Sequence, residues 1–367
     1  MLKMISNQGV KRVFNKTLAA DPWFPPGVAV IGAHREWKST RGKNIVVGVI
    51  DTGIDYRHPD LQNQILDGKN FVPDGNDYYD LNGHGTHVAG IIAANGRLLG
   101  VAPEAKLLIA RALNANGQGD AASIASALDW IGSWRGPNGE QASVVNMSLG
   151  MPVDDTRLHQ TVIQVANSGV TMVAAAGNEG DDNPATLEIS YPAYWLEVLS
   201  VGAVNLALKA ANFTNANDRI AVVAPGVDTF STYPGGKYVQ LSGTSMASPH
   251  IAGAAALIQS HHLRNFGSIP NPEWTYKYLK LNTIDLGNIG YDDLYGYGLF
   301  SFNPSGGIYL RLSANSKKFY SNEQSGNLTH PFISIKGVPY LSLPDLKQQL
   351  YIDYAWFANR GELEIWD

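Results

Sequence analysis

A series of short apolar segments, separated by segments of helical pattern, constrains the fold of this chain more than any other feature. The first apolar segment, NIVVGVID, ends at the acid Asp51, as expected of a strand buried on both faces of a sheet. Similar segments occupy residues 105–113, 143–149, 170–177, 198–204 and 220–226. Helical patterns lie between several of them, at residues 87–94, 121–134 and 156–168. This alternation predicts a three-layer α/β/α fold, in which helices cover both faces of a mainly parallel sheet.

Polar residues at the ends of these segments indicate where a site should lie. Asp51, Asn146 and Asn178 each lie near the carboxyl end of a predicted strand. Because ligands of open parallel sheets bind at that edge, we expect the chemistry to be located there.

Composition excludes several classes of function. The chain of 367 residues contains no Cys, which rules out disulfides, thiolate catalysis and Cys-ligated metals. Its net charge of −5 gives no sign of nucleic-acid binding, and no segment is apolar enough to predict a membrane span. The N-terminus lacks the continuous apolar core of a secretion signal, which favours a cytoplasmic protein. A secreted protein whose signal has been removed is the alternative.

Three parts of the chain differ in composition. Residues 1–27 form a basic extension that ends in the Pro-rich sequence DPWFPPG, and residues 28–303 carry the α/β pattern. After residue 303 the sequence becomes polar and rich in Gly and Ser. We predict that residues 304–367 form a linker and a small C-terminal α+β module, with strands and one short helix.

The segment LSGTSMASPHIAGAAAL, at residues 241–257, places Ser245 before a predicted core helix over residues 252–258. Pro249 suits the first turn of such a helix, because its missing N–H has no helical partner to lose there. Taken alone, Ser245 is compatible with a hydroxyl that merely caps the helix. The segments VIDTGID, NGHGTHVAG and VAAAGNEG favour a catalytic interpretation, because they carry Asp51, His84 and Asn178.

These four residue types supply the parts of an acyl-transfer site. A serine hydroxyl needs a neighbouring base, imidazole can take and return its proton, and a buried carboxylate orients the imidazole. An amide N–H directed at the developing oxyanion contributes about 3–4 kcal/mol to the stability of the transition state. A serine at a helix N-terminus adds its own backbone N–H.

The motifs VIDTGID, HGTHVAG, AAAGNEG and GTSMASPHIAG, in this order, resemble those of the subtilisin-like serine proteases (subtilases) over residues 28–303. The resemblance implies a triad of Asp51, His84 and Ser245, with Asn178 as the oxyanion donor. Within that family the chain is most similar to intracellular subtilisins, through WRGPNGEQ, GDDNPATLEISYPAYW and FTNANDRIAVVAPGV. Members of that group carry a short N-terminal extension that covers the active site until it is cut off, so residues 1–27 are expected to be inhibitory. The group also forms dimers, which implies a homodimer.

The resemblance further implies a peptide-binding cleft. Substrate should lie as an extended strand between two walls, with a pocket for the side chain that precedes the cut. The residues matched to the walls are Ser148, Leu149 and Gly150 on one side and Gly117 and Gly119 on the other. Those matched to the pocket are Ala175, Ala176, Gly177 and Glu179. Small residues predict broad specificity that favours bulky apolar side chains, and Ala121 stands where many relatives have an aromatic residue.

No cofactor is required by this chemistry, but the resemblance implies structural calcium. Asp60 matches a calcium ligand of many subtilases, although the partner loop at residues 93–103 is shorter than in those proteins. The backbone carbonyls of Ala193, Trp195 and Val198 match a weaker cation site.

The sequence therefore predicts a serine endopeptidase that cleaves unfolded or flexible polypeptides through an acyl-enzyme. A catalytically silent peptide-binding or scaffold protein with the same fold is the alternative, and an esterase would use the same groups. Labelling by a fluorophosphonate distinguishes the silent protein, and comparison of casein with a small ester distinguishes the esterase.

Overall fold

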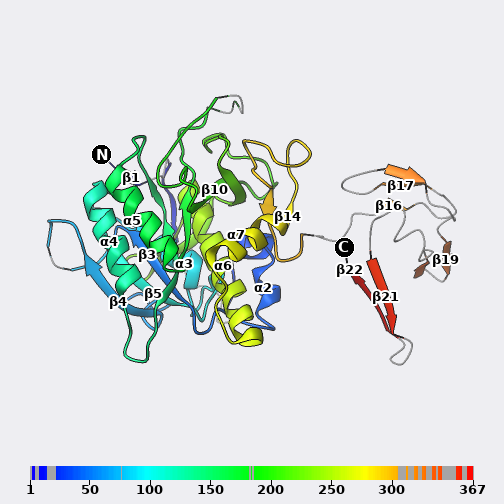
Figure 1. The fold of residues 1–367 in the computed structure, drawn as a ribbon, viewed down its shortest axis with the longest axis horizontal. Coiled ribbons are helices and arrows are strands. Elements are labelled where there is room, and N and C mark those ends of the chain that lie inside the picture. The colour runs from blue at the N-terminus through cyan, green and yellow to red at the C-terminus, as the bar shows by residue number, and fades with distance from the viewer. Residues whose placement is uncertain are drawn as a thin grey trace. The chain divides into compact units, whose positions relative to one another are not determined.

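The computed structural model describes residues 22–304 except residues 76, 182, 184 and 185, together with strands near both termini. It divides into one unit of residues Met1–Phe302 and a second of residues Asn303–Asp367. The ribbon of each unit is drawn in Figure 1.

The first unit is built on a nine-stranded sheet of order β14-β15-β11-β10-β9-β7-β3-β5-β4. Every neighbouring pair is parallel except β14 with β15. The strands are β3 (Val46–Asp51), β4 (Ile65–Asn70), β5 (Lys106–Arg111), β7 (Ala142–Met147), β9 (Thr171–Ala175), β10 (Val198–Val204), β11 (Ile220–Pro225), β14 (Thr283–Ile284) and β15 (Leu299–Phe300). Six of them, β3, β5, β7, β9, β10 and β11, are almost wholly buried, as their continuous apolar sequences predict.

Helices cover both faces of the sheet and create two apolar cores. One core joins the sheet to α3 and α6, and the other joins it to α4 and α5. The helices are α1 (Pro26–Val30), α2 (Ala33–Glu36), α3 (His84–Ala93), α4 (Ala121–Ser133), α5 (Thr156–Asn167), α6 (Thr244–Phe266) and α7 (Pro272–Leu281). The predicted three-layer α/β/α fold with a mainly parallel sheet is confirmed.

Two small sheets lie outside the main one. The first has the order β6-β1-β8 and the second the order β12-β13-β2. Their strands are β1 (Leu2–Met4), β2 (Gln8–Phe14), β6 (Gln118–Gly119), β8 (Leu149–Gly150), β12 (Thr229–Tyr233) and β13 (Lys237–Ser242). Both sheets contain a strand from the N-terminal extension.

Helix α6 starts earlier than the sequence predicted. It begins at Thr244 rather than Ala252, and Pro249 lies inside it instead of in its first turn. A proline at this position cannot donate to the carbonyl four residues earlier, that of Ser245. The hydroxyl of Ser148 donates to that carbonyl oxygen at 2.9 Å instead, so a strand-end residue replaces the missing helical bond.

The second unit contains three short antiparallel sheets, of strands β16-β17-β18, β19-β20 and β21-β22. The strands are β16 (Arg311–Leu312), β17 (Lys318–Tyr320), β18 (Ser325–Asn327), β19 (Ile333–Ile335), β20 (Val338–Tyr340), β21 (Asp353–Phe357) and β22 (Glu362–Trp366). The short helix predicted for this module lies outside the described residues.

Two buried histidines, His87 of α3 and His250 of α6, should make the free energy of unfolding depend on pH. Burial lowers the pKa of His250 from 6.5 to about 4, and burial with the nearby His84 lowers that of His87 to about 3. As the pH falls from 7 to 4, the unfolded chain therefore binds protons that the folded chain excludes. We expect each histidine to remove about 3 kcal/mol from the free energy of unfolding over this range.

Denaturant unfolding of the Ser245→Ala chain at several pH values measures this loss without self-digestion. His250→Asn should unfold with a shallower pH dependence than its parent, since one of the two groups is gone. Identical slopes for the two chains would contradict the assignment.

Candidate active site

Asp51 and His84 meet at the carboxyl edge of the sheet. Asp51 is the last residue of β3, and His84 is the first residue of α3. His84 Nδ1 lies 2.7 Å from Asp51 Oδ1, and the backbone N–H of Thr52 donates to the same oxygen at 2.7 Å. Both side chains are at most 2% exposed, so this contact is shielded from bulk water. A buried carboxylate in this position fixes the orientation of the imidazole ring.

A second carboxylate, that of Asp80, holds the loop before His84. Asp80 Oδ1 accepts from Thr52 Oγ1 and from the N–H groups of Asn82 and Gly83. Its Oδ2 accepts from the N–H and the hydroxyl of Thr86. Asp80 was not among the residues predicted from the sequence; an Asp in a Gly- and Asn-rich loop just before a helix was the available signal.

Gly83 is required at the start of α3. Its φ of +105° lies in the left-handed region, and a Cβ there would collide with the ring of Tyr233. The hydroxyl of Tyr233 donates to the Asn82 carbonyl at 3.0 Å, so the Tyr233 ring packs against the backbone just before His84.

Ser245 lies in the first turn of α6 and is fully buried. Its Oγ donates to the backbone carbonyl of Ser148 at 3.1 Å, while Ser148 Oγ donates back to the Ser245 carbonyl. The side chain of Asn146 donates to Ser148 Oγ at 2.9 Å and so fixes it. The residue predicted as nucleophile is therefore tied directly to one predicted wall of the cleft.

Asn178 is oriented by Thr244, the residue before Ser245. Asn178 Oδ1 accepts from the Thr244 N–H at 2.9 Å and from its hydroxyl at 3.0 Å. This arrangement turns the amide nitrogen of Asn178 away from Thr244. Gly177, with φ +123°, makes the turn after β9, and a Cβ there would collide with Asn215.

Of the four predicted catalytic residues, Asp51 and His84 are hydrogen-bonded to each other. Asn178 is hydrogen-bonded to Thr244, the residue that precedes Ser245 in the chain. The helices that carry His84 and Ser245, α3 and α6, pack against each other in one core. His84 Nε2 has no hydrogen-bond partner among the described residues, and the Ser245 hydroxyl donates to Ser148 instead.

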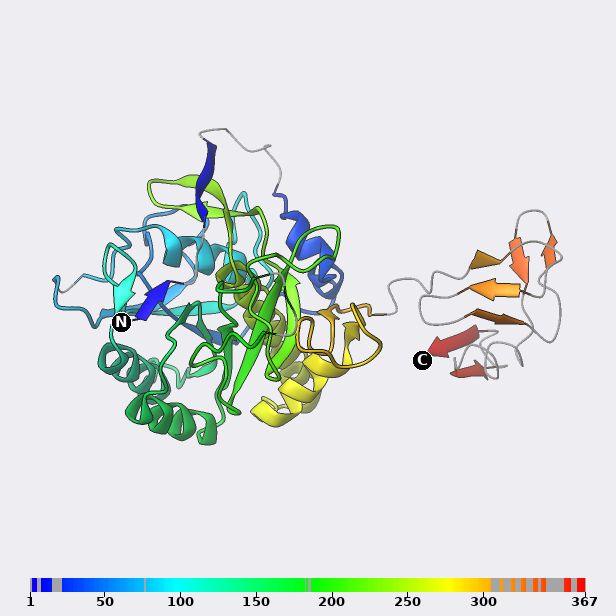
Figure 2. The same ribbon diagram turned by 90° about the horizontal axis from the view of Figure 1, so that it is seen from above.

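The two predicted walls are the strands β6 and β8, and the chain's own N-terminus lies between them. β1 pairs antiparallel with both: Lys3 is opposite Gln118 of one wall and Gly150 of the other. Leu2 is opposite Gly119, and Met4 is opposite Leu149. Figure 2 shows β1, in blue at the N label, between these walls.

The residues predicted to line the side-chain pocket follow β9. Ala175 ends this strand, and Ala176 and Gly177 continue from it toward Asn178. Glu179 is exposed, and its carboxylate accepts from the Asn178 N–H at 2.9 Å. The pocket residues and the predicted oxyanion donor therefore share one turn.

The surroundings of Asp60 do not fit a calcium ion. Its carboxylate accepts from the backbone N–H groups of Arg97 and Leu98, at 2.9 and 3.0 Å, and from the Tyr238 hydroxyl at 2.7 Å. Burial and the Asp60 carboxylate raise the pKa of Tyr238, which keeps this donor protonated. The short loop thus supplies N–H donors where a cation would need the carboxylate oxygens.

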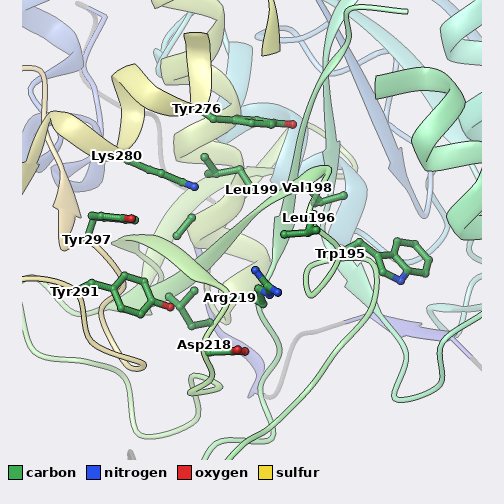
Figure 3. A pocket seen from close by; sticks show the side chains of 12 residues that line it. Trp195, Leu196, Val198, Leu199, Asp218, Arg219, Tyr276, Lys280, Tyr291 and Tyr297 are labelled. Atoms are coloured by element: carbon green, nitrogen blue, oxygen red, sulfur yellow. The ribbon is translucent and has the colours of Figure 1, made fainter. Parts of the chain in front are cut away.

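Positive charges lie beside the second predicted cation site. Trp195 and Val198 line a cavity of about 310 Å³ that also contains the side chains of Arg219, Lys280 and Asp218 (Figure 3). Burial, and to a lesser degree the Arg219 charge, lower the pKa of Lys280. Calcium prefers several oxygen ligands with negative charge, so two cations and one carboxylate would weaken its binding here.

Calcium binding is untested, and thermal unfolding measures it. Because both predicted sites carry groups that disfavour a cation, we expect the unfolding midpoint of the Ser245→Ala chain with excess calcium to exceed that with a chelator by less than about 2 °C. Asp60→Asn distinguishes the two sites. A large calcium effect abolished by Asp60→Asn would contradict the account of Asp60, whereas a large effect that survives it would indicate the carbonyls of Ala193, Trp195 and Val198.

Comparison with known proteins agrees with the fold. The sequence profile of the subtilase family (Peptidase_S8) matches residues 42–298, which is most of the first unit. The chain belongs to the subtilase family and is a subtilisin-like serine protease.

Several curated relatives are bacterial proteases. The intracellular serine protease of Paenibacillus polymyxa is 45% identical over 276 residues, 72% of this chain and 82% of the relative. The major intracellular serine protease of Bacillus subtilis strain 168 is 47% identical over 252 residues, 66% and 77% of the two chains. Subtilisin E of the same strain is 42% identical over 268 residues, 71% and 65%. No helix among the described residues has the length and apolarity needed to span a membrane.

Proposed function

We propose that this chain is an endopeptidase that hydrolyses unfolded or flexible polypeptides through an acyl-enzyme on Ser245. The observation that carries the proposal is the buried 2.7 Å contact between Asp51 and His84, together with the packing of α3, which begins at His84, against α6, which carries Ser245 in its first turn. The orientation that this contact gives to His84 leaves Nε2 as the nitrogen able to accept a proton.

The first half of the reaction forms the acyl-enzyme. Ser245 Oγ attacks the carbonyl carbon of the scissile bond while His84 Nε2 takes its proton. Rotation about the Cα–Cβ bond of Ser245 would move the hydroxyl from the Ser148 carbonyl toward His84. Asn178 Nδ2 and the Ser245 N–H donate to the oxyanion, and α6 directs the positive end of its dipole at it.

The second half releases the products. His84 gives its proton to the leaving amine as the C–N bond breaks, and the amine departs. Water then attacks the acyl-enzyme with His84 again as base, which frees the acid and restores Ser245. Throughout, Asp51 stays ionised and stabilises the imidazolium.

A fluorophosphonate probe tests this assignment on the full chain after incubation long enough for its N-terminus to be shortened. We expect stoichiometric labelling of Ser245, located by mass spectrometry of digested protein, together with hydrolysis of casein. Labelling without casein hydrolysis would favour the esterase alternative. The absence of both labelling and hydrolysis would favour a silent scaffold.

The small residues of the predicted pocket support broad specificity for bulky apolar side chains.

The N-terminal extension is proposed to inhibit the enzyme by occupying the substrate cleft. Its support is the antiparallel pairing of β1 with both walls, which is the position expected of substrate. Removal of residues before the α/β domain would then release activity.

Intact-mass analysis of freshly purified protein over time tests the inhibition. We expect activity to appear with a lag, as chains shortened at the N-terminus accumulate, and no shortening in Ser245→Ala. Lys3→Pro should remove the lag, because proline cannot donate a backbone N–H to the walls, whereas Lys3→Thr should keep it. Full activity of the unshortened parent chain from the first time point would contradict the proposal.

Two further properties rest on the relatives. The names of two of them include the word intracellular, and we propose the same location for this chain. A homodimer stays a prediction, and sedimentation of the full chain measures the oligomeric state. The division of the chain into an extension, a peptidase domain and a C-terminal module also stays a prediction.

A further inference from the structure

A cavity at the amino ends of two central strands contains positive charges and aromatic rings. It has a volume of about 310 Å³, and Val198 and Ile220, the first residues of β10 and β11, contribute to its lining. The catalytic residues proposed above lie at the opposite edge of the same parallel sheet, where Asp51 ends β3. A ligand in this cavity would therefore not occupy the substrate cleft.

Arg219 and Lys280 bring two positive charges to the cavity. Neither forms a salt bridge or a side-chain hydrogen bond with a described residue. Burial and, after it, the Arg219 charge lower the pKa of Lys280, so the two cations are close enough to repel each other. Figure 3 shows the Lys280 ammonium directed into the space that the Arg219 guanidinium also borders.

The carboxylate of Asp218 also lines this cavity but does not pair with either cation. It accepts from the Tyr194 hydroxyl at 2.9 Å instead. Two cations and one carboxylate leave an excess positive charge, which favours an anion. Because Asp218 would repel a second negative charge, a ligand with a single charge suits the cavity better than one with two.

Tyrosine side chains supply much of the remaining lining. Tyr276, Tyr291 and Tyr297 border the cavity, and the rings of Tyr291 and Tyr297 meet edge to face at 5.2 Å. Burial and the carboxylates of Asp293 and Asp218 raise the pKa of Tyr291 to about 12, so its hydroxyl remains a hydrogen-bond donor. Such a lining offers aromatic surface to a planar group and donors to a charged end.

We propose that this cavity binds a small organic carboxylate with an aromatic body. The planar guanidinium of Arg219 can donate two parallel N–H bonds to a carboxylate, and the Lys280 ammonium adds a second positive charge. A bound carboxylate would offset the repulsion between these cations. It would also connect the residue before β11 to the last turn of α7 and so stabilise the fold.

Calorimetric titration of the full Ser245→Ala chain tests the site without self-digestion. N-acetylphenylalanine and its amide share the same body and differ in charge. We expect a Kd of about 1 mM for the acid and binding of the amide that is weaker by about tenfold or more, because the amide lacks the charge that pairs with the two cations. Inorganic phosphate should also bind at least about tenfold more weakly than the acid, since it has no aromatic body. The acid should raise the thermal unfolding midpoint.

Matched variants locate the binding. Arg219→Gln and Lys280→Gln each remove one charge from an exposed or half-buried position, and each should weaken binding of the acid by about tenfold. Lys277→Gln is the control, because Lys277 lies on the same helix as Lys280, is exposed, and is not among the described residues that line the cavity. Thermal unfolding without ligand checks that all three variants fold.

Three results would overturn the inference: equal binding of the acid and the amide, binding of the acid that is unchanged in both charge variants, or binding of phosphate as tight as that of the acid. None of them bears on the proposed endopeptidase function, because the titrated chain lacks the Ser245 hydroxyl.

Discussion

Replacing Ser245 with Ala is expected to lower kcat for peptide hydrolysis by about a million-fold, the loss typical of serine-protease triads. The variant keeps the buried Asp51–His84 pair and the proposed oxyanion donors, so a small residual rate over water should remain. KM should change little, because the hydrogen bond from the Ser148 hydroxyl to the Ser245 carbonyl still holds this wall when the Ser245 hydroxyl is lost. Burst kinetics with an ester substrate and fluorophosphonate labelling should both disappear.

Ser248→Ala provides the control for this change. Ser248 lies one turn further along α6, and its hydroxyl is 3.0 Å from that of Ser148. It is a buried serine of the same helix with no proposed part in proton transfer, so its kcat should stay within about tenfold of the parent. A kcat of Ser245→Ala close to that of the parent chain would contradict the assignment of Ser245 as the nucleophile.

Replacing Asp51 with Asn is expected to lower kcat by about ten-thousand-fold while the chain stays folded. The amide nitrogen of Asn can donate to His84 Nδ1, and this stabilises the tautomer whose proton sits on Nε2. In that tautomer Nε2 cannot accept the proton of Ser245. The measurement is kcat at neutral pH, with circular dichroism and a thermal midpoint as checks on folding.

Asp55→Asn is the matched control for Asp51→Asn. Asp55 is equally buried, but its carboxylate accepts from the N–H groups of Arg57 and Gly235 and does not contact His84. Its replacement should affect stability more than kcat. If Asp51→Asn lost less than about tenfold in kcat, the orienting role of Asp51 would be wrong.

The sequence predicted well those features that depend on local pattern. Continuous apolar segments predicted the buried strands, and Asp51 lies at the end of β3 as its segment indicated. The polar segment flanked by Gly placed His84 just before a helix, and α3 begins at His84 itself. These features were predictable because buried strands and helix ends have characteristic residue types at neighbouring positions in the sequence.

Features that depend on distant partners were not predictable in the same way. The start of α6 was placed too late, because Pro249 indicated a first turn and nothing nearby reveals that Ser148 supplies the missing donor. The donors around Asp60 come from the short loop after α3 and from Tyr238 of β13. The strand β2 has no strong alternation of its own, and its pairing depends on an edge formed by residues 237–242.

The reciprocal bonds between Ser148 and Ser245 have a consequence for engineering. Residue 148 belongs to a predicted wall of the substrate cleft, yet its hydroxyl bonds to the first turn of α6, the helix that carries the proposed nucleophile. A substitution there cannot change selectivity alone, because it also disturbs turnover of every peptide. Redesign of substrate preference should start instead from the half-buried Ala121, whose methyl group makes no hydrogen bond to a residue of the site.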